Sequence, residues 1–326
     1  MNRDFFHTGL QIGRSDIRSL LNGKGPGNEF YVDYRYGADG NDGNSWAKAL
    51  RTYSEAISRV TDNNNDVIYI DGDSEIVETA MVTISKNRVH TIGCNGPFPI
   101  VGYGAGARIT LGVTIADTDI ATIKNTGVRN TFSGIKVSNS NTLATNLYTF
   151  AEGGEYTRFF NSEFYKSALL TTDLTAELLM NGDSSQFYRC TFGDLDNEKG
   201  AAGIEIPNVL LDREGITGKV CRDGWFEDCR LLRRAAHVDV CHVYSKDATA
   251  VERSLVFKNC VFWNSVLSTA VIADSVNFAA AQTQGDVLLI NPAGVNISAI
   301  AGANLNIYVS SGTAQTTDGV SEEIAA

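Results

Sequence analysis

The sequence predicts an all-β chain folded as a parallel β-helix, a solenoid whose coils are built from short strands and turns. The first observation is a six-residue phrase that occurs five times. It has a phenylalanine first, a usually small or sulfur-bearing residue fourth and a large apolar residue sixth. The copies begin at Phe132, Phe159, Phe187, Phe226 and Phe257, which are 27, 28, 39 and 31 residues apart. Repeats of this length cannot bury an apolar face alone, so they must stack on one another.

The second observation is strand-like alternation inside the phrase. In the last three copies the fourth and sixth residues alternate with mostly polar neighbours, which is the period of a strand. Turn-forming Gly, Asn, Asp and Ser separate the copies, without sustained helical periodicity. Equivalent strands should therefore pair in parallel, about 4.8 Å apart. The fourth residues should form one interior column, Ile135, Ser162, Cys190, Cys229 and Cys260, beside a second column of Phe192, Leu231 and Phe262.

A β-sandwich whose strands share an inward phenylalanine is the alternative architecture. Its strands recur about every 8 to 12 residues, too often for the spacing seen here. The solenoid also explains the length, because 326 residues can be accommodated by adding coils without a domain boundary. Between residue 66 and about residue 293 there is room for roughly eight coils at one strand spacing each.

Composition limits the partners. The net charge of −11 argues against a nucleic acid or an anionic membrane, which bind clustered Lys and Arg. No apolar run is long enough to cross a membrane, and the first residues lack the apolar core of a signal peptide, so we expect neither membrane insertion nor classical secretion. The six cysteines show no C-x-x-C spacing. Packed free thiols in a chain folded in a reducing cytoplasm are expected, although stacked thiols would lie within bridging distance.

The chain divides into four segments. Residues 1–29 form an arm, 30–65 a strand, loop and capping helix, 66–294 the β-helix, and 295–326 C-terminal strands and a polar tail. The arm should contain a short helix over 16–21, and it carries four Lys/Arg against three Asp/Glu. Its apolar residues are too few for a core of their own, so they either pack on the same subunit or anchor a partner. These residues are Phe5, Phe6, Leu10, Ile12, Ile17, Leu20 and Leu21.

Residues 30–72 have the most specific pattern. A strand over 30–33 is followed by a Gly/Asp/Asn-rich loop that leads to Trp46. Thr52 and Glu55 then have the spacing of a capping box, and Leu50, Tyr53, Ile57 and Val60 would form one apolar face of the helix that it starts. The segment Asp66-Val-Ile-Tyr-Ile70 begins the first coil.

This succession resembles the opening of the pectin-lyase-like right-handed parallel β-helix superfamily, especially its members in phage virions. The resemblance covers residues 30 to about 75 closely and extends more loosely, through the phenylalanine phrases, to about residue 265. It implies that the helix plugs the amino-terminal end of a right-handed solenoid, which would otherwise expose unpaired strand edges. It also implies a homotrimer that binds other virion proteins, such as those of the capsid or tail.

Three groups of residues carry side chains that could perform chemistry or bind a metal. The loop Asp39–Asn44 has closely spaced oxygen side chains, but it lacks the closing Glu of a calcium loop. The carboxylates of Asp194, Asp196 and Asp228 could serve a glycosidase, which needs two carboxylates about 5 to 10 Å apart. Strand alternation would place His237, Asp239 and Cys241 on one face and His242 on the other, which argues against a shared metal site. We expect no catalytic site, metal or cofactor.

Two stretches should project from the rod. Residues 88–118 are rich in glycine and proline, and residues 193–224 lie in the longest interval between phrases. Beyond Lys258 there is no Lys or Arg, and strands are expected over 287–290, 295–297 and 305–309.

The function that these observations favour is a non-enzymatic structural protein of a phage-like virion, a spike or capsid decoration attached by its arm and folded in the host cytoplasm. The alternative is a tailspike-type protein that binds or depolymerises host surface glycan. A secreted carbohydrate-active enzyme is disfavoured by the missing signal peptide. The viral assignment depends partly on analogy of fold.

Overall fold

The computed structural model describes residues 27–73, 75–94, 106–213, 215–216, 219–279, 283–302 and 306–310. All seven apolar residues of the arm lie outside these ranges, and so do most of the tail and the helix expected over 16–21. Within the described residues, no helix is both long and apolar enough to cross a membrane.

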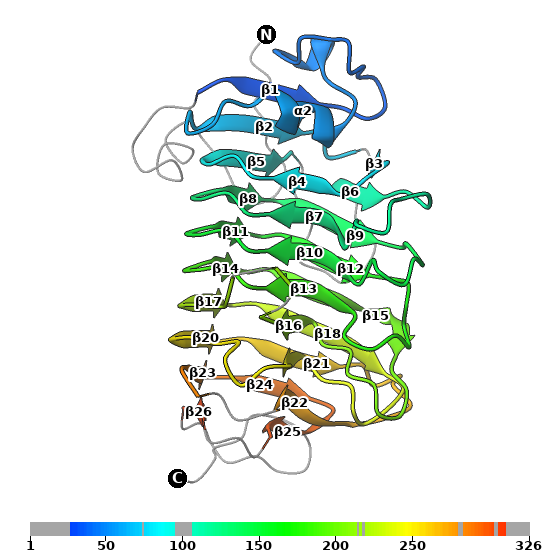
Figure 1. Cartoon of the computed structure of the whole chain (residues 1–326). Coiled ribbons are helices and arrows are strands. Elements are labelled where there is room, and N and C mark those ends of the chain that lie inside the picture. Colours follow the sequence, from blue (N-terminus) through cyan, green and yellow to red (C-terminus); the bar gives the residue numbers. More distant parts are fainter. Residues whose placement is uncertain are drawn as a thin grey trace.

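Three parallel sheets run along the rod, and successive coils contribute one strand to each (Figure 1). Sheet A has ten strands: β1 (Glu29–Val32), β2 (Asp66–Ile70), β5 (Val89–Gly93), β8 (Thr131–Ser133), β11 (Arg158–Phe160), β14 (Gln186–Tyr188), β17 (Gly224–Glu227), β20 (Ser254–Lys258), β23 (Asp286–Ile290) and β26 (Ile307–Val309). The predicted parallel β-helix is therefore confirmed, with the short helix near its amino-terminal end.

The other two sheets have eight strands each. Sheet B contains β3 (Glu75–Glu78), β6 (Ala107–Leu111), β9 (Ile135–Asn139), β12 (Glu163–Lys166), β15 (Thr191–Lys199), β18 (Arg230–Ala235), β21 (Val261–Asn264) and β24 (Ala293–Val295). Sheet C contains β4 (Val82–Ile84), β7 (Ala121–Asn125), β10 (Tyr148–Glu152), β13 (Ala176–Met180), β16 (Val209–Leu211), β19 (Val243–Ser245), β22 (Ile272–Phe278) and β25 (Ile297–Ala301). The described residues thus make eight coils with a strand in every sheet.

The first residues of the five phrases stack in register along sheet A. Phe159 pairs with Phe132 on one side and Phe187 on the other, and the column continues through Phe226 to Phe257. Consecutive ring centroids are 5.0, 4.4, 4.5 and 4.6 Å apart, with nearly parallel planes. Such offset stacks contribute to stability beyond the buried area. The core is therefore a continuous column rather than a central cluster.

One residue bends each coil between sheets A and B. At the third position of the phrase the backbone is left-handed, with φ of 65° at Gly134, 46° at Asn161, 53° at Arg189, 54° at Asp228 and 53° at Asn259. Gly and Asn adopt this conformation most readily. The bend turns the fourth residue inward, and Ile135, Ser162, Cys190, Cys229 and Cys260 are all fully buried.

The short helix α2 (Tyr53–Arg59) covers the first coil, and side chains of that coil hold both of its ends. Glu78 accepts hydrogen bonds from the backbone N–H groups of Tyr53 (2.8 Å) and Ser54 (3.2 Å). The Lys86 Nζ donates to three carbonyl oxygens of the last turn, those of Ile57, Ser58 and Val60. An anion at the amino end and a cation at the carboxyl end both complement the helix dipole.

Only half of the predicted capping box forms. The Thr52 hydroxyl accepts from the Glu55 N–H at 3.3 Å, as expected. The return bond from Glu55 is absent because Asp39 already accepts from the Thr52 N–H at 2.9 Å, and Glu55 pairs instead with Arg59 at 2.7 Å. The Arg59 guanidinium also donates to the carbonyl oxygens of Asp39 and Asn41, so a cationic side chain lies against the loop Asp39–Asn44.

The expected projections at 88–118 and 193–224 are wrong in part. Each range contains ordinary strands, β5 and β6 in the first and β15 and β16 in the second. Glycine and proline counts misled the interpretation because a solenoid corner needs the same residues as a loop. The carboxylates at 194–198 belong to β15, where a bulge shifts the register between Gly193 and Glu198.

We predict that Phe187→Ala will lower the free energy of unfolding by about 3–5 kcal/mol, the usual loss for a fully buried phenylalanine. The ring stacks at 4.4 and 4.5 Å on both neighbours in the column. Phe160→Ala is the matched control, because Phe160 is half-buried on the outer face of sheet A and should cost only about 1 kcal/mol. Urea unfolding followed by circular dichroism measures both. Equal losses would contradict the stacked interior.

We further predict that Lys86→Met will loosen α2 while leaving the coils folded, since three carbonyl groups lose their donor. The expected cost is about 1–2 kcal/mol, confined to local opening of the helix. Hydrogen exchange of residues 53–60 should be faster in this variant than in Lys48→Met, a control at an exposed lysine. Unchanged exchange in residues 53–60 would show that Lys86 does not hold the helix.

Candidate functional site

A second apolar cluster covers the outer face of sheet C over four coils. Apolar side chains of β7, β10, β13 and β16 form a second buried cluster on this face, separate from the interior core. Ile216, from the connection after β16, is 6% exposed and packs into it. The cluster comprises Ala121, Tyr148, Ala151, Ala176, Leu179, Leu210 and Ile216. Over these four coils the outer face of sheet C is therefore covered largely by apolar side chains.

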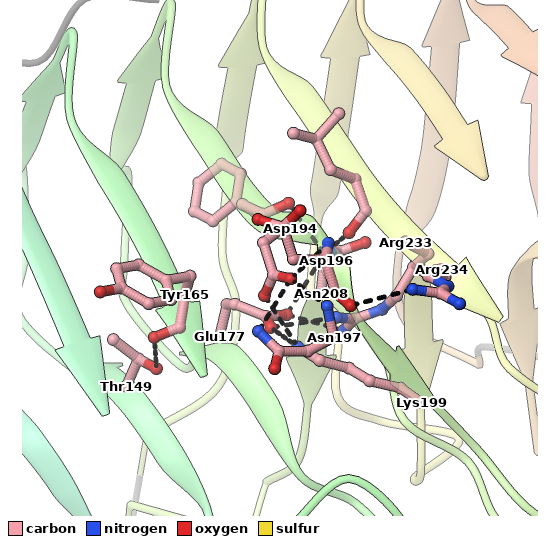
Figure 2. A network of polar contacts seen from close by, with 12 residues as sticks. Thr149, Tyr165, Glu177, Asp194, Asp196, Asn197, Lys199, Asn208, Arg233 and Arg234 are labelled. Atoms are coloured by element: carbon pink, nitrogen blue, oxygen red, sulfur yellow. Dashed lines mark hydrogen bonds and ion pairs between the residues drawn. The ribbon is translucent and has the colours of Figure 1, made fainter. Parts of the chain in front are cut away.

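A buried ionic network lies where sheet B turns toward sheet C (Figure 2). One oxygen of Glu177 accepts from the Lys199 Nζ at 2.6 Å, and the other pairs with the Arg233 Nη2 at 2.7 Å. The Asn208 amide also donates to Glu177, at 3.2 Å. The side chains of Glu177, Lys199 and Arg233 are at most 3% exposed. The network is thus shielded from solvent. Buried ion pairs need several partners to offset the hydration that they lose.

Asp194 lies beside this network, but it accepts hydrogen bonds mainly from backbone N–H groups. Its Oδ1 accepts from the N–H groups of Asp196 (2.9 Å) and Asn197 (2.7 Å) and from the Asn197 amide (3.0 Å), which shapes the bulge of β15. Its Oδ2 lies 3.8 Å from the Lys199 Nζ. A carboxylate held in this way is an acceptor that fixes a turn.

The other two candidate carboxylates, Asp196 and Asp228, are exposed. Asp196 is exposed on the same bulge, and its carbonyl oxygen accepts from Arg234 at 3.2 Å. Asp228 is the exposed left-handed residue of a bend between sheets A and B, and it accepts from the Asn259 amide in the next coil at 3.2 Å. The structure therefore places Asp194 and Asp196 together on the bulge of β15 and Asp228 at a separate bend.

The protonation of Glu177 argues against a role for this residue as a general acid. Burial alone would raise the pKa of Glu177, but Arg233 and Lys199 outweigh it and hold that pKa below its ordinary value. Glu177 therefore stays ionised and has no proton to give. Lys166, 1% exposed nearby, has a pKa lowered to about 7 by burial and by Lys199.

A different carboxyl, Glu205, has the environment of a proton donor. It lies half-buried in the connection before β16, and burial is the main cause that raises its pKa to about 7. Asp239, Asp173 and Asp274 raise it further, while a hydrogen bond from the Cys241 thiol opposes the shift. Near neutral pH a fraction of this carboxyl therefore carries a proton beside acidic neighbours, and a raised carboxyl pKa is what glycosidases use for their general acid.

The segment 237–242 is a turn rather than a strand, so the expected alternation does not apply. His237 pairs with Asp239 at 3.1 Å near the surface. His242 is fully buried, and its Nδ1 lies 3.2 Å from the Ser275 hydroxyl. Cys241 is also buried, with its thiol directed to Glu205 at 3.6 Å. In the described ranges, no group of three or more His, Cys, Asp or Glu is arranged to hold a metal ion.

All six cysteines are free thiols. Cys229 donates to the Phe187 carbonyl at 3.4 Å, and Cys260 to the Phe226 carbonyl at 3.6 Å, so each thiol is bonded to the coil before it. Burial raises the pKa of both thiols well above the ordinary value. These thiols are packing groups rather than nucleophiles.

The sequence reasoning missed Glu177, Arg233 and Glu205. Glu177 lies between Ala176 and Leu178 in a strand whose five residues are all buried, and a charge in such an apolar run was the available signal. Glu205 had no such signal, because its neighbours Asp239, Asp173 and Asp274 come from other coils.

Comparison with known proteins identifies the fold. No protein-family model matches the sequence, and no curated protein does. The pectate lyase Pel9A superposes with a TM-score of 0.58 at 13% identity, over 89% of this chain and 70% of its own. A pectin methylesterase from Aspergillus niger gives 0.54 at 14% identity, over 93% and 92%. A Geobacillus virus E2 protein, ORF18, gives 0.43 at 13% identity, over 89% and 57%, too low a score to support an argument. The first two likenesses show a shared β-helix fold and nothing of function.

We predict that Arg233→Met will lower the free energy of unfolding by about 3–5 kcal/mol, because it leaves the buried Glu177 with one cation fewer. Arg234→Met, at the next residue of β18, is the matched control. Arg234 is 30% exposed, and its pair with Glu198 spans 3.7 Å, so its loss should cost less than about 1 kcal/mol. Denaturant midpoints of the two variants give the comparison. A control that lost as much as Arg233→Met would refute the role assigned to the network.

Proposed function

We propose that this chain is a non-enzymatic structural protein of a phage-like virion, a spike or decoration whose β-helix is the rigid rod. The observation that carries the proposal is the use made of the candidate carboxylates. Asp194 fixes a bulge, Asp228 forms a bend, and Glu177 is held ionised between two cations. Polar groups that an enzyme would direct at a substrate are here bonded to the fold itself.

The virion assignment is supported by the resemblance of residues 30–75 to phage β-helix proteins, whose helix closes the first coil as α2 does here. The same resemblance supports a homotrimer bound to capsid or tail proteins. The apolar residues of the arm, within residues 1–29, are proposed to make the attachment. A rod whose interior is one stacked column suits this role, because its length grows with the number of coils and not with a new core.

A second candidate, processing of host surface glycan, is favoured by one observation. Burial and acidic neighbours raise the pKa of Glu205 to about 7, which is in the range that a general acid needs near neutral pH. Against it stands the apolar cluster that closes the adjacent outer face of sheet C over β7 to β16.

Two measurements on the same preparation test the proposal. Deleting residues 2–26 should abolish incorporation into particles while circular dichroism still reports the folded rod. The full chain should leave host capsule or lipopolysaccharide at its original length when product size is measured by gel filtration. Glycan shortening that Glu205→Gln abolishes, but Asp228→Asn does not, would replace the structural assignment with the second candidate. Normal incorporation of the truncated chain would refute attachment through the arm.

A further inference from the structure

Three side chains of the buried network bring together the groups that form an amide (Figure 2). The Lys199 Nζ donates to the Glu177 Oε1 at 2.6 Å and lies 3.8 Å from the Asp194 Oδ2. The side chains of Lys199, Glu177 and Asp194 are 3%, 1% and 8% exposed. A lysine amine, a carboxylate that can take its proton and a second carboxyl group therefore lie together where water has little access.

The two oxygens of the Asp194 carboxyl have different surroundings. Oδ1 accepts from the N–H groups of Asp196 (2.9 Å) and Asn197 (2.7 Å) and from the Asn197 amide (3.0 Å). Donors placed in this way stabilise the negative charge that develops on an oxygen when a nucleophile adds to its carbon. Oδ2 is buried and accepts no hydrogen bond from the described residues. The oxygen that faces Lys199 can therefore leave without breaking a hydrogen bond.

We propose that Lys199 and Asp194 condense to an isopeptide bond that closes the bulge of β15 covalently, with Glu177 passing on a proton of the amine. The reaction first needs an uncharged amine and an uncharged carboxyl, which form when one ammonium proton passes to Oδ2. Burial makes this conversion less costly, because it disfavours the charged forms. The fold holds the reacting groups together, so the step is intramolecular.

Bond formation then requires no further reagent. The lone pair of the Lys199 Nζ forms a bond to the Asp194 Cγ, and a second proton passes from Nζ through Glu177 to Oδ2. The bond between Cγ and Oδ2 breaks, and Oδ2 leaves as water with both protons, while the third ammonium proton stays on the amide nitrogen. Glu177 is ionised before and after the reaction, in agreement with its lowered pKa.

Glu177 lies nearer to the amine than Asp194 does, but it is the poorer acceptor of a nucleophile. One of its oxygens pairs with the Arg233 Nη2 at 2.7 Å, and the other accepts from Lys199. A carboxylate held as an anion between two cations resists addition to its carbon. A bond between Lys199 and Glu177 would also leave the buried Arg233 without its counter-ion, at a high cost.

A second lysine–aspartate pair provides a comparison within the same chain. The Lys246 Nζ lies 3.7 Å from the Asp212 Oδ2, nearly the distance found at Lys199, but the Lys246 side chain is 40% exposed. Water surrounds that amine and keeps it charged, so we expect no bond at this pair.

Mass spectrometry of the full wild-type chain tests the bond directly, after the folded protein has been denatured and digested with trypsin. Residues 190–213 should appear as one peptide that lacks the mass of one water, because trypsin does not cleave after an acylated lysine. Cleavage after Lys246 should remain complete. Cleavage after Lys199 in a chain of full mass would overturn the proposal. A branched product that joins 190–213 to 167–189 would also overturn it, since it would place the bond on Glu177.

Variants identify the reacting groups. Lys199→Arg should have the full mass expected from its sequence, whereas Lys246→Arg, the matched control, should still lack one water. In Glu177→Gln, which cannot take the proton, the bond should form about a hundredfold more slowly after refolding from denaturant. A water loss that persists in Lys199→Arg would come from another reaction, such as cyclisation of an aspartate onto its own backbone, and would overturn the proposal. An unchanged rate in Glu177→Gln would overturn the proton relay. The wild-type digest is decisive even if neither buried variant folds.

Discussion

In-register stacking of each coil on the next is the constraint on which the rest of the structure depends. A coil buries its apolar residues only against the equivalent residues of its neighbours, so the side chain at a given position must fit the same position one coil away. The phenylalanine column satisfies this requirement with rings 4.4 to 5.0 Å apart. The left-handed bends follow from it, because the chain must turn at the same point in every coil. The side-chain contacts that hold α2 in place follow from the same constraint, because the first coil has no preceding coil to cover it.

The same constraint explains how charges come to lie inside the rod. At the corner between sheets B and C, charged residues of three successive coils meet one another rather than water. Glu177 lies between Lys199 and Arg233, and Asp194 completes the set. Beside sheet C, stacking instead brings acidic residues of several coils near Glu205. Stacking thus creates both a network in which acidic and basic side chains pair and a cluster in which acidic side chains gather.

The repeated phrase was sufficient to predict the fold, the number of coils and the interior position of residues such as Cys229, because periodicity and burial are local signals. The sequence could not predict the partners of charged residues. Glu177 and Arg233 are 56 residues apart, and Glu205 and Asn277 are 72 apart. Asp228 was considered for catalysis because its chemistry is visible in the sequence, while its backbone conformation is not. The capping-box prediction was wrong in part for a related reason, since the fold of the loop brings Asp39 to the Thr52 N–H.

The central claim is that the five phenylalanine phrases occupy one column of adjacent coils. A crystal structure tests it most directly through electron density for the rings of Phe132, Phe159, Phe187, Phe226 and Phe257. The account predicts five rings in a single stack, consecutive centroids no more than about 5 Å apart, on neighbouring strands of one parallel sheet. Rings distributed over different sheets, or separated by intervening strands, would contradict the architecture and every assignment that follows from it.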